Sequence, residues 1–163
     1  MTERERTVQW DDVAPGLAVL PTLSGIDFLR EMIEGRLPPP PIAKLMGFTL
    51  TEVGPGKATF ICDTDESQYN PIGTVHGGLV CTLLDSAIGC AAQTTLPAGL
   101  GYTSIEIKIN YLRPVLHNSG PLTAVGTVTK PGSRVAFAEG VVTDAAGKVV
   151  ATASSSVLVF PIG

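Results

Sequence analysis

The sequence has few charged and few aromatic residues. Of its 163 residues, 16% are charged and 6% are aromatic, whereas 44% are hydrophobic. The net charge is −4 and no basic stripe occurs, which argues against a partner made of nucleic acid. A chain of this size with so many apolar residues has more hydrophobic surface than one small core can bury. We therefore expect its subunits to associate into a homodimer or homotetramer.

Signals for membranes, export and metals are also missing. No apolar run is as long as a membrane span, and the N-terminal residues lack the pattern of a signal peptide. The three cysteines are odd in number, and the two histidines, His76 and His117, are far apart. Neither set has metal-ligand spacing. We expect no metal, no membrane partner and a location in the reducing cytoplasm.

The chain changes character near residue 40. Residues 1–40 are expected to form an extension, with a helix over about 26–33 that Thr22 or Ser24 caps. The four prolines at 38–41 predict a stiff spacer rather than a packed element. Residues 41–163 form the main domain, which begins with a short helix over 42–46 that ends at Gly47.

The main domain combines one long helix with several strands. The predicted helix, about 77–96, is apolar on nearly every side, which is typical of a buried helix. Strands are expected over 48–53, 57–62, 103–111, 122–129, 135–143 and 149–160. The residues of strand 103–111 alternate with period two, which predicts a strand with one buried face. The alternation is of Thr103, Ile105, Ile107, Ile109 and Tyr111 with Ser104, Glu106, Lys108 and Asn110. An antiparallel sheet curled around the helix would bury both, which is an α+β architecture.

One charged residue interrupts the apolar helix. Asp85 is the only charged side chain between Glu66 and Glu106, with His76 taken as neutral. Burying a carboxylate costs several kcal/mol unless it is paired, so a purely structural role would be expensive. A carboxylate in such a position suits a general base or a nucleophile. The alternative is that Asp85 caps a neighbouring backbone segment.

The segment that precedes this helix has the features of a carbonyl-binding loop. Gly77 and Gly78 stand at the helix start, where free N–H groups and the helix dipole stabilise a developing negative charge. His76 is interpreted as a hydrogen-bonding residue that fixes the loop, either structurally or as part of the site. Asn70 either positions a water or the substrate carbonyl, or serves as a turn residue before Pro71.

A family resemblance rests on two spaced motifs. They are Asn70-Pro71-x-Gly73-x-x-His76-Gly77-Gly78 and Leu83-Leu84-Asp85-x-Ala87. Together they resemble the signature of hotdog-fold thioesterases of the phenylacetate-degradation (PaaI-like) type. Thr103-Ser104 and the run Asn110-Tyr111-Leu112-Arg113-Pro114 fall where that family has matching residues. The resemblance extends from about residue 41 to residue 159 and leaves out the first forty.

The resemblance implies a fold, an activity and roles for individual residues. The fold would be a hotdog, a curved antiparallel sheet wrapped around one long central helix, here with short N-terminal helices. The activity would be hydrolysis of an acyl-coenzyme A thioester. Asp85 would be the base or nucleophile, the Gly77 N–H would polarise the thioester carbonyl, and Asn70 and Ser104 would orient the reacting groups. The site would lie at a dimer interface, and coenzyme A would be part of the substrate rather than a cofactor.

Helix geometry agrees in part with a site shared by two chains. His76 and Asp85 are nine positions apart, near opposite sides of one helix at about 3.6 residues per turn. For the phosphates of coenzyme A, the candidates are the cations Arg113, Lys130 and Arg134. The backbone N–H groups of Gly132 and Ser133 are further candidates, although the family often has paired arginines here. Ordinary solvated surface charge remains the alternative.

Two other functions are compatible with the same fold. A hotdog enoyl-CoA hydratase would need an aspartate two residues before Asn70, where this chain has Gln68. A non-enzymatic acyl-CoA-binding module is the second alternative. The acyl group is left open as aryl-acetyl or medium-chain fatty acyl. Whether Asp85 attacks the thioester or activates water is also open.

Overall fold

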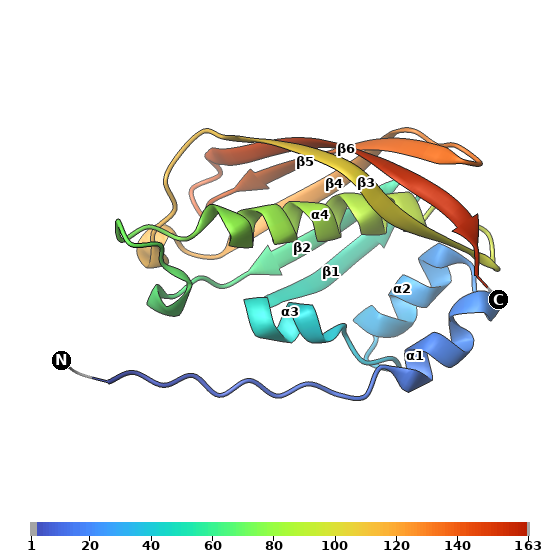
Figure 1. Cartoon of the computed structure of the whole chain (residues 1–163), viewed down its shortest axis with the longest axis horizontal. Coiled ribbons are helices and arrows are strands. Elements are labelled where there is room, and N and C mark those ends of the chain that lie inside the picture. Colours follow the sequence, from blue (N-terminus) through green and yellow to red (C-terminus); the bar gives the residue numbers. More distant parts are fainter. Residues whose placement is uncertain (1–2, 163) are drawn as a thin grey trace.

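The computed structural model describes residues 3–162 and contains one six-stranded sheet (Figure 1). The order across the sheet is β1-β2-β4-β5-β6-β3, and all neighbours are antiparallel. The strands are β1 (Phe48–Gly54), β2 (Lys57–Cys62), β3 (Leu100–Tyr111), β4 (Leu122–Lys130), β5 (Val135–Thr143) and β6 (Val149–Pro161). All six expected strands are therefore present, and β1 and β3 form the two edges.

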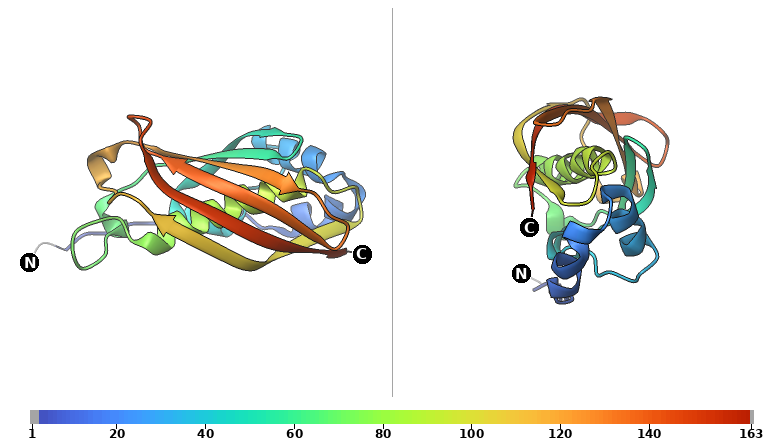
Figure 2. Two further views of the ribbon diagram at one scale, coloured as in Figure 1. Left: turned by 90° about the horizontal axis from the view of Figure 1, so that it is seen from above. Right: turned by 90° about the vertical axis from the view of Figure 1, so that its right-hand side faces the viewer.

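The long helix α4 (Gly77–Gln93) lies against the concave face of this sheet, which curls over it in the end-on view of Figure 2. Two glycines allow the close approach. Gly126 of β4 and Gly140 of β5 are paired across the sheet. A Cβ at Gly126 would lie 2.1 Å from the carbonyl oxygen of Ala87, and one at Gly140 would lie 2.9 Å from Leu84 and Ile88 side chains. The expected hotdog arrangement is confirmed.

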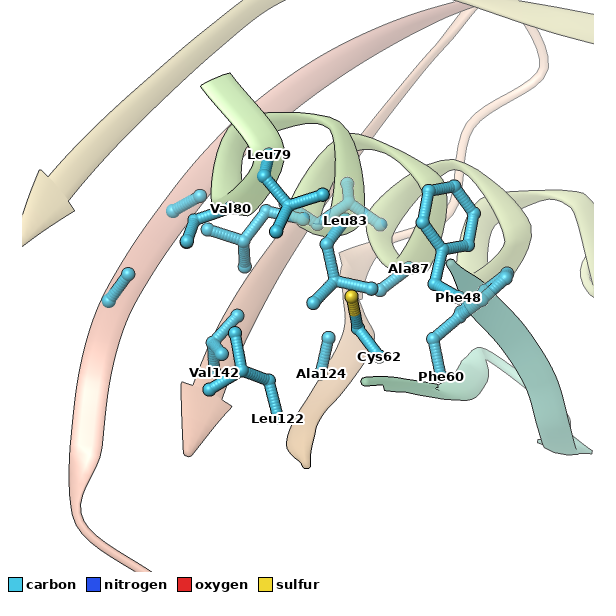
Figure 3. Close-up of a cluster of buried hydrophobic side chains, with 14 of the residues drawn as sticks. Phe48, Phe60, Cys62, Leu79, Val80, Leu83, Ala87, Leu122, Ala124 and Val142 are labelled. Atoms are coloured by element: carbon cyan, nitrogen blue, oxygen red, sulfur yellow. The ribbon is translucent and has the colours of Figure 1, made fainter. Parts of the chain in front are cut away.

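The core fills the space between α4 and the sheet (Figure 3). Leu83 and Ala87 of α4 have no exposed surface and pack in one cluster with Leu122 and Val142 of the sheet. This apolar burial supplies most of the stability of such a domain. Among residues 3–162, no helix has both the length and the apolar character that crossing a bilayer requires.

The N-terminal region packs against the domain. It contains α1 (Ala14–Val19), the 3-10 turn η1 (Leu20–Thr22), α2 (Gly25–Ile33) and α3 (Pro41–Met46). Ser24 caps α2 by accepting a hydrogen bond from the Asp27 N–H, and α2 lies against β1 and α4. The helices over 25–33 and 41–46 match the prediction, whereas α1 was not predicted. The proposed boundary near residue 40 stays a prediction.

Strand β3 contains a β-bulge that reverses part of the expected alternation. Ser104 pairs with Val157 and Glu106 pairs with Ser156, so Ile105 is an extra residue. Ile105 is 56% exposed, and Thr103 is also exposed, whereas Ile107 packs against the core. The predicted alternation therefore holds at Ile107 and Ile109 but fails at Thr103 and Ile105, because a bulge shifts the side-chain phase by one residue. The same shift turns Ser104 toward α4.

Candidate active site

In the first turn of α4, the backbone N–H of Gly78, which was expected to be free, is paired, whereas that of Gly77 is unpaired in the described part of the chain. His76 is the N-cap residue, and its Nδ1 accepts a hydrogen bond from the Gly78 N–H at 2.8 Å. The Gly77 carbonyl accepts from the Tyr111 hydroxyl at 2.9 Å. Within residues 3–162, the Gly77 N–H has no hydrogen-bond acceptor. A free N–H at a helix start is a group that can stabilise an oxyanion.

Asn70 organises the loop that leads into α4. Its Oδ1 accepts from the N–H groups of Ile72 and Thr74, both at 3.1 Å, and its Nδ2 donates to Thr74 Oγ1 at 2.8 Å. The loop is further fixed by the His76 N–H, which donates to the Gln68 carbonyl. The amide of Asn70 keeps one N–H for another acceptor. The position of the Asn70 side chain is therefore determined mainly by its hydrogen bonds to other residues of the loop.

Asp85 lies on α4 beside Ser104 of β3. Ser104 Oγ donates to Asp85 Oδ1 at 2.6 Å, a short hydrogen bond of the charge-assisted kind. Asp85 is only half-buried, whereas its place in the apolar helix predicted a buried carboxylate. The physical reason is that Asp85 points not into the packed core but toward a cavity. Its second carboxylate oxygen, Oδ2, makes no hydrogen bond with the residues that the structure describes.

The cavity beside Asp85 has a volume of about 280 Å³. Its walls come from α2, α3, β1, β2, α4 and β3. The lining residues are Met32, Pro39, Pro40, Ala43, Lys44, Phe48, Thr49, Leu50, Phe60, Asp85, Ser86, Cys90 and Tyr102. Most of these side chains are apolar, and Asp85 is the only carboxylate among them. The arrangement places one carboxylate at the wall of a space suited to an apolar group.

The Gly77 end and Asp85 are separated within one chain. Eight residues of α-helix span roughly 12 Å along the axis. A second hollow of about 320 Å³ lies at the Gly77 end and is lined by Asn70, Gly77, Tyr111 and Arg113, but not by Asp85. One thioester carbonyl cannot contact both groups of a single chain over this distance.

The candidate coenzyme A residues fall into two groups. Arg113 lies at the Gly77 end, where its guanidinium donates to the Val149 carbonyl at 2.8 Å. Lys130, Gly132, Ser133 and Arg134 form the β4–β5 hairpin. That hairpin lies near the other end of α4, since Val128 beside it bonds to Gly56, and Gly56 bonds to Thr94. The structure does not bring Arg113 together with the hairpin in one chain.

Two tyrosines border these groups without having been predicted as site residues. Tyr111 holds the Gly77 carbonyl and belongs to the run 110–114, which was noticed only as a match. Tyr102 lies against Cys90 and Gly89, and a Cβ at Gly89 would be 2.5 Å from its hydroxyl. Burial raises the pKa of Tyr102 well above its usual value and that of Cys90 to about 12.

Between residues 3 and 162, no three His, Cys, Asp or Glu side chains gather as metal ligands.

Comparisons with known proteins identify the family. A sequence model of the thioesterase superfamily matches residues 72–151. The human protein acyl-coenzyme A thioesterase 13 is 31% identical over 125 residues, covering 76% of this chain and 88% of the relative. The mouse protein of the same name is 31% identical over 104 residues, covering 63% of this chain and 73% of the relative.

Solved structures support the same fold. A phenylacetic acid degradation-related protein from Ralstonia eutropha superposes with a TM-score of 0.73 at 25% identity, over 80% of this chain and 98% of that chain. The Escherichia coli PaaI protein gives a TM-score of 0.70 at 21% identity, over 93% and 97%. The second likeness bears on the fold alone. Sequence and structure together show that the chain belongs to the thioesterase superfamily and is a thioester hydrolase.

Proposed function

We propose that this protein hydrolyses acyl-coenzyme A thioesters to a free carboxylic acid and coenzyme A, with Asp85 as the catalytic carboxylate. The observation that carries the proposal is the hydrogen bond from Ser104 to Asp85 at the wall of an apolar cavity. The relatives named acyl-coenzyme A thioesterase 13 support a coenzyme A thioester as the substrate class. The acyl group would occupy the cavity, aryl-acetyl or medium-chain fatty acyl groups being the candidates.

The reaction can take two courses at Asp85. As a general base, Asp85 takes a proton from water while the water oxygen attacks the thioester carbon. The C–S bond then breaks, and the coenzyme A sulfur leaves and takes up the proton. As a nucleophile, a carboxylate oxygen attacks the carbon itself, coenzyme A leaves, and water hydrolyses the resulting anhydride. In both courses Ser104 holds one Asp85 oxygen so that Oδ2 faces the cavity.

Single-turnover hydrolysis in ¹⁸O-water detects the nucleophilic course when water attacks the Asp85 carbonyl of the anhydride. In the nucleophilic course, a protein carboxylate takes up ¹⁸O when water attacks the anhydride at the Asp85 carbonyl. Water attack on the acyl carbonyl would instead place the label in the released acid alone, as in the general-base course. In the general-base course the label enters only the released acid. Mass spectrometry of the peptide that contains Asp85 gives the result.

The carbonyl oxygen would be stabilised by the Gly77 N–H of a second copy of the chain. Strand β3 is an edge strand, so its outer side can pair with another strand. The strand carries Ser104, which contacts Asp85, and Tyr111, which holds Gly77. Two β3 edges paired antiparallel about a two-fold axis between Ile107 and Lys108 place Ser104 opposite the other copy's Tyr111. That register brings Asp85 of one chain toward Gly77 of the other.

The proposal includes a homodimer at least, or a tetramer of two such dimers. A long unprotected edge strand with the exposed Ile105 supports it. Sedimentation at micromolar concentration should show a species of at least twice the chain mass of 16.9 kDa. A single-chain species alone would contradict the shared site.

For coenzyme A, we place the phosphates on Arg113 or on the β4–β5 hairpin. Arg113 has no ion pair within residues 3–162, and neither have Lys130 and Arg134, so all three cations are available to an anion. The N–H groups of Gly132 and Ser133 would add donors to the hairpin. His76 and Asn70 would act by holding the loop that presents Gly77.

A thiol-release assay with a panel of acyl-coenzyme A substrates tests the proposed function. The account expects release of free coenzyme A, and loss of that release in Asp85→Asn. Loss of enoyl absorbance without thiol release would indicate a hydratase. Binding without any turnover would indicate an acyl-CoA-binding module. Either outcome would overturn the proposal.

A further inference from the structure

One wall of the cavity beside Asp85 is formed by the N-terminal region. Five of its thirteen lining residues precede β1, namely Met32, Pro39, Pro40, Ala43 and Lys44. The proline segment therefore packs against the site rather than acting only as a spacer. The two motifs that carry the family resemblance, residues 70–78 and 83–87, lie outside this region.

This wall is firmly attached to the domain. The Gly25 N–H donates to the Leu96 carbonyl at 2.9 Å, and a Cβ at Gly25 would lie 1.9 Å from the Gln93 carbonyl oxygen. Leu29 is only 2% exposed and Leu37 is also buried. Both ends of the segment that carries Met32 are therefore packed. A wall held in this way restricts what the cavity can contain.

The wall and the interior offer little to a polar occupant. Pro39 and Pro40 have no N–H to donate. Cys90 and Tyr102 stay neutral at ordinary pH because burial raises the pKa of each. Among the lining residues, Asp85 and the exposed Lys44 carry the only charges. The matching occupant is apolar over most of its length, with one reactive end near Asp85.

The volume bounds the size of that occupant. An apolar cavity of about 150 Å³ in another protein holds one benzene molecule. By the same measure, the cavity of about 280 Å³ in this protein has room for about twice the volume of benzene. That corresponds to an acyl group of roughly ten carbons or fewer.

We propose that the N-terminal region, through Met32 and Ala43, forms the wall that limits acyl length, and that the enzyme prefers acyl groups of up to about ten carbons. This inference rests on the proposed acyl-coenzyme A hydrolysis. Shortening Met32 extends the cavity, and enlarging Ala43 fills it. Each methylene that gains or loses a buried position changes kcat/KM by about fourfold.

The test measures kcat/KM for straight-chain acyl-coenzyme A substrates from acetyl to palmitoyl. Met32→Ala should move the optimum to longer chains and raise the activity on the first chain beyond the wild-type limit by about fourfold or more. Ala43→Leu should move the optimum to shorter chains while acetyl-coenzyme A hydrolysis persists. Ile33→Ala is the matched control, because Ile33 is next to Met32 on α2 but does not line the cavity. Its profile should equal that of the wild type.

Parallel profiles for the wild type and both wall variants would overturn the inference. So would an equal loss on all chain lengths, which indicates a general loss of structure. If no acyl-coenzyme A is hydrolysed, the proposed function fails, and calorimetric binding of free fatty acids from butyrate to laurate then decides. If the fatty acid that binds most tightly is longer in Met32→Ala than in the wild type, the wall limits acyl length as proposed. If neither wall variant changes the affinities, the inference is wrong.

Discussion

Gly77 and Asp85 both belong to α4, but they are held in position in different ways. The Gly77 end is a backbone site: its donor is an N–H group, fixed by the loop that Asn70 and His76 organise. Asp85 is a side-chain site, fixed by a hydrogen bond from β3 and open to an apolar cavity. The first can stabilise negative charge and the second can activate a nucleophile. One chain thus carries both halves of the proposed hydrolytic site but holds them roughly 12 Å apart.

Removing the carboxylate should have the largest effect. Asp85→Asn should lower kcat by about 10²–10⁴, because an amide neither takes a proton from water nor attacks a carbonyl. The amide oxygen can still accept the Ser104 hydrogen bond, so packing around it is kept. Rates and thermal midpoints of both proteins are compared. Activity within about threefold of wild type would remove Asp85 from the mechanism, and equal loss of activity and folding would favour a structural role.

Removing the backbone donor should have the next largest effect. Gly77 is the first residue of α4, where proline is tolerated, and the preceding His76 already has an extended conformation that proline allows. Gly77→Pro should therefore delete the N–H, keep the helix and lower kcat by about 10²–10³. Gly77→Ala is the matched control, because it adds a Cβ 3.1 Å from the Tyr111 ring but keeps the N–H. Equal rates for the two variants would assign the effect to crowding of Tyr111 instead.

The support of Asp85 should matter less than Asp85 itself. A hydrogen bond to a charged group contributes about 1.5–3 kcal/mol, so Ser104→Ala should lower kcat by about 10- to 150-fold. Ser104→Thr keeps the hydroxyl and should restore most of the rate. No recovery with threonine would show that Ser104 acts through packing in β3 rather than through its hydroxyl.

How far this site could be predicted from sequence differs between its two halves. Asp85 stands out because no other charged residue lies between Glu66 and Glu106. Gly77 and Gly78 stand out because backbone N–H groups at a helix start can stabilise a developing negative charge. The orientation of Ser104 could not be read from alternation, because the bulge at Ile105 depends on pairing between β3 and β6. The cavity wall was missed for a similar reason: four consecutive prolines favour an extended conformation but do not specify what they pack against.

Changes to the cations should have the smallest effect on rate. Arg113→Ala, Lys130→Ala and Arg134→Ala should each leave kcat nearly unchanged, and whichever residue binds phosphate should raise KM when replaced. Because Arg113 lies at the Gly77 end and the others lie in the β4–β5 hairpin, the residue that responds shows which end holds coenzyme A. An unchanged KM in all three would place the phosphates elsewhere.

The most direct test of the shared site is a dimer made from two different inactive chains. Asp85→Asn and Gly77→Pro chains are co-expressed with different affinity tags, and the mixed dimer is isolated by purifying on both tags. A site shared between chains leaves one intact Gly77–Asp85 pair in each mixed dimer, so thioester hydrolysis should return to about half the wild-type rate. A mixed dimer as inactive as its two parents would contradict the account, since it would mean that each chain needs its own Gly77 and its own Asp85.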